Sequence, residues 1–160
     1  MAAYLETTFE ATNKVGFEDY VQRGKGNKTF DIEHVLPANV LDTKVDLGTA
    51  YDFASDAEYS QKRNSIGGLI LLSRGRNRSL KAATYSTKLP IYATKSILPQ
   101  TLTPSFYTNN PLVVTKIGEL GLPLVSVTAF NSSAIDARNV LYDAIAAIIW
   151  NPDDILTMAT

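Results

Sequence analysis

The residues best suited to chemistry lie in one short segment that contains the single histidine of the chain. His34 directly follows Glu33, and a second carboxylate, Asp31, stands two residues before Glu33. A neutral imidazole can accept a proton from water, and carboxylate oxygens are ligands that Mg²⁺ prefers. A lone histidine is more often structural than catalytic, so the interpretation depends on the neighbouring carboxylates. Together they favour a general base beside a divalent cation.

A second segment offers another oxygen ligand at a suitable distance along the chain. Residues 29–35 alternate apolar and acidic side chains, which predicts a strand, and residues 69–72 form a compact apolar strand after Gly67 and Gly68. A four-residue turn then places Asn77 at the start of a helix. In such a ββα arrangement the amide of Asn77 can face Glu33, and both would be hard oxygen ligands for Mg²⁺.

The charge distribution indicates an anion-binding surface around this second segment. Residues 61–95 hold eight basic residues and no acid, whereas the other 125 residues hold all 16 acids and only seven bases. A surface that is merely soluble would mix its signs, although a solvated basic face explains the block equally well. The basic residues are Lys62, Arg63, Arg74, Arg76, Arg78, Lys81, Lys88 and Lys95.

Length and composition predict one soluble domain over residues 1–160. Apolar residues make up 45% and charged residues 19% of the chain, which is an ordinary globular composition. The absence of cysteine excludes disulfides, thiol nucleophiles and cysteine-built zinc sites, so no zinc is expected. No apolar run is long enough to cross a bilayer and no signal peptide is visible, which favours a cytoplasmic protein without a membrane partner.

The remaining pattern predicts a mixed α+β domain. Helices are expected at residues 17–21 and 56–63, the latter with Ser55 as its cap, and Pro90 is expected to open or interrupt a further helix that ends near Ile97. The Thr- and Pro-rich stretch 99–123 suggests loops with short strands, with 113–114 and 124–127 packed inside. A scaffold helix at 133–150 has capping-box-like spacing at Ser133 and Asp136.

The ordered set of motifs resembles the HNH branch of the His-Me finger nucleases, and most closely the C-terminal domain of GmrSD-type restriction endonucleases. That family reads approximately Glu-His-Ile-Leu-Pro-Gln, then Ile-Gly-Asn-Leu-x-Leu-Leu, then Asn with Lys and Tyr eleven and fifteen residues later. The matching positions are 33–38, 66–72, Asn77, Lys88 and Tyr92. The resemblance is strong over residues 28–97 and weaker over 130–151.

The resemblance implies a ββα-metal core with surrounding helices and a metal-dependent nicking activity on double-stranded DNA. Glu33 and Asn77 would hold one Mg²⁺ or Mn²⁺, and His34 would activate the attacking water. Asp31 would either orient the site as a neighbour of the ligands or simply begin the strand, and Lys88 would contact a phosphate. The expected backbone contacts are Arg63, Arg74, Arg76, Arg78 and Lys81.

One position departs from the family pattern. Gly68 stands where the family has an asparagine that braces the loop of the catalytic histidine. Either Asn64 replaces that brace or the loop is held in another way.

Three functions remain open from the sequence. The first is a nuclease of a system that restricts phage or foreign DNA, whose family usually carries an N-terminal sensor and nucleotide-hydrolysing domain in the same parent protein. The second is a catalytically weak or inactive nucleic-acid-binding module, which Gly68 favours. The third is an interaction domain whose basic block binds an acidic protein partner.

Overall fold

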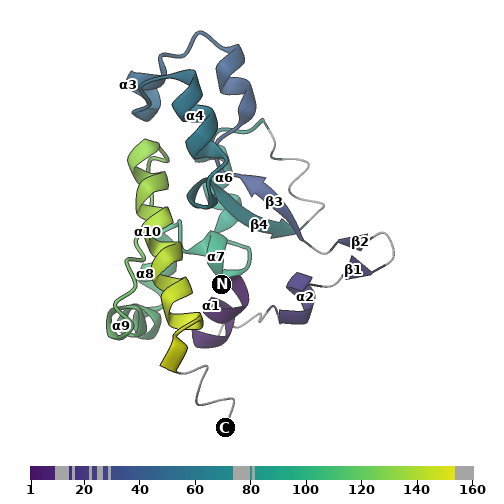
Figure 1. Cartoon of the computed structure of the whole chain (residues 1–160), viewed down its shortest axis with the longest axis vertical. Helices are drawn as coiled ribbons and strands as arrows, with labels where there is room; N and C mark the ends of the chain where they lie inside the picture. Colours follow the sequence, from purple (N-terminus) through teal and green to yellow (C-terminus); the bar gives the residue numbers. More distant parts are fainter. Residues whose placement is uncertain are drawn as a thin grey trace.

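The computed structural model describes residues 1–9, 15, 17–21, 23–24, 27–28, 30–73, 80 and 82–153. Over these residues the chain is a mostly helical α+β domain with two small antiparallel strand pairs. Figure 1 shows the larger pair at the centre of the molecule, with helices around it and the long helix α10 along one side. Among the residues that the structure describes, no helix is long and apolar enough to cross a membrane.

The central strand pair consists of β3 (Phe30–His34) and β4 (Leu69–Ser73), which confirms both predicted strands. They are antiparallel, with His34 opposite Leu69 and Glu33 opposite Ile70. Because successive side chains on a strand point to opposite faces, Glu33 and His34 lie on different faces of the pair. The smaller pair joins β1 (Arg23–Gly24) to β2 (Asn27–Lys28).

The helix α4 (Asp56–Arg63) and the single turn η2 (Ile66–Gly68) connect the two segments of the candidate site. Ser55 caps α4 by accepting a hydrogen bond from the Glu58 amide at 3.1 Å, as predicted. The turn η2 then leads directly into β4. The other elements before β4 are α1 (Ala2–Thr8), α2 (Phe17–Val21), η1 (Ala38–Asp42) and α3 (Leu47–Tyr51).

The second half of the chain is more helical than the sequence suggests. The prediction of loops with short strands at 99–123 is wrong, because that stretch contains the last residues of α7 (Ile97–Gln100) and all of α8 (Pro104–Asn109) and α9 (Pro111–Glu119). Pro104 and Pro111 occupy the first helical positions, where a missing N–H costs nothing and the fixed φ favours a helix start. Residues 124–127 are irregular rather than a strand, although Leu124 is buried.

The boundaries of two other helices differ from those predicted. The helix α6 (Tyr85–Tyr92) begins after Thr84, which caps it, and contains Pro90, so Pro90 does not open a helix; the predicted end near Ile97 is wrong, because the helix ends at Tyr92. The scaffold helix α10 (Ser132–Ile149) is confirmed, but Asn131 caps it in place of Ser133 by accepting from the Ala134 amide at 2.9 Å.

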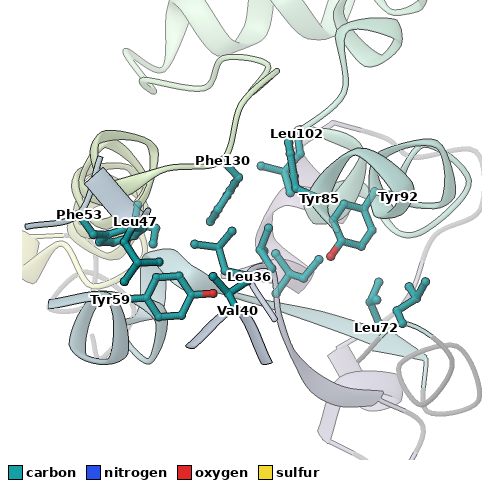
Figure 2. Close-up of a cluster of buried hydrophobic side chains, with 14 residues drawn as sticks. Leu36, Val40, Leu47, Phe53, Tyr59, Leu72, Tyr85, Tyr92, Leu102 and Phe130 are labelled. Atoms are coloured by element: carbon teal, nitrogen blue, oxygen red, sulfur yellow. The ribbon is translucent and has the colours of Figure 1, made fainter. Parts of the chain in front are cut away.

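Two apolar clusters hold these elements together. The first lies under the inner face of β3 and β4 and joins the segment after β3 to α4 and α6; Figure 2 shows Tyr59, Leu36, Leu72, Tyr85 and Tyr92 within it. The second packs α1, α7, α8 and α9 against α10. Full burial of each large side chain contributes about 1.5–3 kcal/mol, so the two clusters fix the frame around the strand pair.

Candidate active site around His34

His34 is the last residue of β3, and its imidazole is half-buried against the end of α4. Its Nε2 lies 2.9 Å from Oδ1 of Asn64, the residue that follows α4. The Asn64 amide is itself oriented, because its Nδ2 donates to the Ser60 carbonyl at 2.8 Å. An amide oxygen only accepts, so Nε2 must carry the proton of the neutral ring. Nδ1 is then the nitrogen that can accept a proton.

The surroundings of His34 favour its neutral form. Burial lowers the pKa of His34 below its usual value, and the positive charges of Arg63 and Lys88 lower it further. The hydrogen bond to Asn64 opposes this change, because a protonated ring also donates to Asn64. The imidazole is therefore uncharged and able to act as a base at neutral pH.

Glu33 lies on the inner face of β3, where Lys88 of α6 meets it. The carboxylate is almost fully buried, and its Oε1 is 2.6 Å from Lys88 Nζ. The same ammonium group donates to the carbonyls of His34 at 2.8 Å and Val35 at 3.1 Å. The ammonium group therefore has one carboxylate and two carbonyl oxygens around it, and the lysine side chain is completely buried. The expected phosphate contact by Lys88 is thus corrected: the lysine is directed into the domain.

Arg63 lies beside the same segment as the last residue of α4. Its Nε donates to the Leu36 carbonyl at 2.7 Å, and Nη1 lies 3.4 Å from Asn64 Oδ1. The guanidinium is only partly buried. The structure thus brings together His34, Glu33, Asn64, Arg63 and Lys88 out of the residues singled out in the sequence.

Gly68 has a steric role at this site. A Cβ at this position would lie 2.9 Å from the Arg63 carbonyl carbon and from Lys62 O, and still closer to Arg63 O. Real Cβ atoms essentially never approach other atoms so closely, so the glycine allows the end of α4 to pack against β4. Because α4 and β4 lie so close together, Asn64, which follows α4, reaches the imidazole of His34. Asn64 contacts the imidazole rather than the loop main chain, so the loop brace is supplied by other residues.

The turn η2 is also held from its other side by α10. Arg138, nearly fully buried, donates from Nε to Gly67 O at 2.9 Å and from Nη2 to the Tyr142 hydroxyl at 2.7 Å. Asn139 Oδ1 accepts from the Gly67 amide at 2.8 Å. Neither Arg138 nor Asn139 was predicted from the sequence as a residue of the site. Their positions on the core-facing helix at 133–150 were the available signal.

The outer face of the strand pair borders a hollow of about 550 Å³ next to the candidate site. Asn64 and Ile32 line it, together with Leu69 and Leu71 of β4. Ile32 is 61% exposed on this face, whereas Glu33, Ile70 and Leu72 on the other face of the pair are buried. The imidazole of His34 shares this face of β3, so the site opens toward a largely apolar hollow.

The other predicted site residues fall into two groups. Asp31 lies opposite Leu72 in the register and is half-buried, but its side chain forms no hydrogen bond or ion pair with another residue that the structure describes. Asn77, Arg74, Arg76, Arg78 and Lys81 lie outside the described residues. Leu80, three residues after Asn77 in the sequence, has helical backbone and is buried in the first cluster.

Of the two predicted metal ligands, Glu33 lies among the residues that the structure describes, whereas Asn77 does not. Among the residues described, no group of three or more His, Asp and Glu side chains could hold a metal ion. Glu33 has the hard oxygen donors that Mg²⁺ prefers, and Lys88 partly offsets its charge.

A half-buried neutral histidine, oriented by an amide and next to a buried carboxylate, has the features of a hydrolytic centre. Comparison with protein families gives a match over residues 3–141 to the model described as GmrSD restriction endonucleases, C-terminal domain. The chain belongs to this family, as its motifs indicated, and a restriction-endonuclease function follows for the family. Searches of curated proteins and of solved structures gave no match.

Proposed function

We propose that this domain is a metal-dependent DNA endonuclease in which His34 takes a proton from the attacking water. The observation that best supports this role is the contact between His34 Nε2 and Asn64 Oδ1 at 2.9 Å. It leaves Nδ1 as the proton acceptor on a ring whose pKa is lowered by burial and by two neighbouring cations. General-base catalysis of this kind contributes typically about 10²–10⁴-fold to the rate.

We propose Glu33 and Asn77 as the ligands of one Mg²⁺ or Mn²⁺ ion, in a ββα-metal core of the HNH type. When bound, the ion would neutralise charge that develops on the phosphate and on the leaving 3′-oxygen. Lys88, 2.6 Å from Glu33, opposes the binding of a second cation there. We therefore expect the ion to bind weakly to the free protein and to require a DNA phosphate oxygen as a further ligand.

The proposed substrate is double-stranded DNA, held mainly through its phosphates. Arg63 is suited to such a contact, because its Nε anchors the side chain to Leu36 O while the guanidinium remains partly exposed beside His34. Arg74, Arg76, Arg78 and Lys81 would extend this surface. Phosphate contacts are largely independent of sequence, so the domain alone should cut with little sequence preference.

The proposed setting is a restriction system in which a sensor and nucleotide-hydrolysing domain of the same parent protein directs the nuclease. The alternative of an inactive binding module was favoured by Gly68. Because Gly68 lies against the end of α4, a steric requirement explains the glycine without a loss of activity.

A nicking assay on supercoiled plasmid tests this proposal. We expect the wild type to produce open circles with Mg²⁺ or Mn²⁺ and none with EDTA, and we expect Asn77→Ala and His34→Ala to lose this activity while keeping the fold. A plasmid that shifts on the gel but is never cut by the wild type, with either metal, would support the binding module instead. Cutting that persists in EDTA would exclude the metal.

A further inference from the structure

In the segment from His34, the last residue of β3, to Pro37, four consecutive main-chain carbonyl groups each accept a hydrogen bond from a side chain. The donors come from α4 and α6, which lie on either side of the segment. The bonds are Lys88 Nζ to His34 O at 2.8 Å and to Val35 O at 3.1 Å, Arg63 Nε to Leu36 O at 2.7 Å, and Tyr59 Oη to Pro37 O at 2.6 Å.

These bonds are needed because the segment has few other partners for its carbonyls. Residues 35–37 belong to no helix or strand, and Val35 and Leu36 are almost completely shielded from water. A buried carbonyl without a partner costs free energy, so these groups must find donors in the protein. Here the donors are supplied by side chains, which are themselves fixed by packing.

The three donor residues are anchored independently of the segment. Tyr59 is fully buried and packs edge-on against Phe53 at a ring distance of 5.0 Å. Lys88 is fully buried and paired with Glu33, and Arg63 ends a helix that Gly68 allows to lie close to β4. Each donor therefore fixes the segment to a rigid element.

We propose that Lys88, Arg63 and Tyr59 form a carbonyl clamp whose function is to position the His34 imidazole for catalysis. Lys88 is its central member, because it holds the carbonyl of His34 itself and the next one along. The clamp holds the main chain on the Cα side of the histidine, while Asn64 holds the far edge of the ring. The catalytic part of this inference rests on the proposed function; the positioning part does not.

The clamp predicts a particular split in the kinetics. Loss of any clamp residue should slow cleavage at saturating DNA. The affinity for DNA should stay unchanged in Lys88→Met and Tyr59→Phe, since neither side chain is exposed to DNA. One lost hydrogen bond in Tyr59→Phe corresponds to a fall of about 2- to 12-fold. Lys88→Met removes two bonds and displaces the base, for which a loss of roughly 100-fold is expected. Lys88→Arg keeps charge and donors and should recover part of the rate.

The single histidine of the chain provides a second measurement that does not require cleavage. The imidazole ¹⁵N and ¹H signals of the metal-free protein come from His34 alone. We expect them to shift or broaden in Lys88→Met and Tyr59→Phe at a fixed pH. Two controls should leave them in place: Lys116→Met removes an exposed, ion-paired lysine on α9, and Ile145→Ala lowers stability through the second apolar cluster.

The experiment thus measures single-turnover rate at saturating DNA, DNA affinity and the His34 signals for these variants. Unchanged His34 signals in folded Lys88→Met and Tyr59→Phe would overturn the clamp, and so would a loss of DNA affinity with the saturated rate retained. If Lys88→Met fails to fold, Tyr59→Phe decides the question alone. If the wild type does not cleave DNA, the proposed function fails, and the signals still decide whether the clamp positions the ring.

Discussion

The packing of Gly68 against the end of α4 leads to a quantitative prediction. Adding a single methyl group in Gly68→Ala places a Cβ 2.9 Å from the Arg63 carbonyl carbon and from Lys62 O, whereas ordinary contacts begin at 3.4 Å. The atoms must therefore separate by at least 0.5 Å, and they are main-chain atoms that cannot rotate away. The displacement acts on Arg63 and Asn64, which contact the His34 loop and ring.

Overpacking of this kind costs typically about 1–3 kcal/mol. For a domain of this size each kcal/mol lowers the melting temperature by roughly 2–4 °C, so Gly68→Ala should melt about 2–12 °C below the wild type. Cleavage should fall as well, since Asn64 moves away from the imidazole. Gly68→Asn, which restores the residue typical of the family, should be at least as destabilising, because its Cβ meets the same atoms.

Gly118→Ala is the matched control. Gly118 lies in the exposed part of α9, and no atom lies within 4 Å of a Cβ built there. The substitution should raise stability by about 0.5–1 kcal/mol, since alanine favours a helix more than glycine does. Thermal unfolding followed by circular dichroism measures both variants. A Gly68→Ala protein as stable and as active as the wild type would refute the steric reasoning.

Three further predictions concern the groups around His34 and the turn η2. In the metal-free protein an NMR titration of the single histidine should give a pKa below 6.5, because burial and the charges of Arg63 and Lys88 disfavour protonation. The neutral ring therefore stabilises the fold above about pH 6.5, and this contribution is lost as the pH falls toward the pKa of His34 in the folded protein. A measured value above 6.5 would contradict this. Asn64→Ala should lower the cleavage rate about 2- to 12-fold, the value of one hydrogen bond, and unchanged His34 ¹⁵N signals would argue against the tautomer assignment. Arg138→Met leaves the buried Gly67 carbonyl without its side-chain donor and should cost about 1–3 kcal/mol in urea unfolding; a midpoint equal to that of the wild type would show that α10 does not hold η2.

The sequence predicts the central strand pair well because its signals are local. Alternation in residues 29–35 follows from the two-residue side-chain period of a strand, and the short apolar run at 69–72 is typical of a strand that is covered on both faces. The same holds for α4, where Ser55 and the first-turn acids are typical start signals. The helices at 97–119 were not predicted, because Pro and Thr are read as loop residues unless proline is recognised at a helix start.

The candidate site was harder to predict because it depends on side-chain direction and burial. The motif places Lys88 near Glu33 and His34, but charge alone suggests an exposed residue, and only the packing of α6 shows that it is buried. Tyr59 looks like a core residue in the sequence, since its ring fills the core, and its hydroxyl contact to Pro37 depends on a segment 22 residues away. In the sequence Gly68 is only a departure from the family pattern, and its steric role follows from the packing of α4 against it.

The proposed role of His34 as the base of a metal-dependent endonuclease can be tested with a plasmid substrate. Single-turnover nicking of supercoiled plasmid is compared between the wild type and His34→Ala in Mg²⁺, and the nicked product is then treated with a DNA ligase. We expect a rate at least about 10²-fold lower for the folded variant, together with wild-type nicks that the ligase reseals, since attack by water with departure of the 3′-oxygen leaves a 5′-phosphate and a 3′-hydroxyl. Nicking by His34→Ala at the wild-type rate, or wild-type nicks that cannot be resealed, would contradict it.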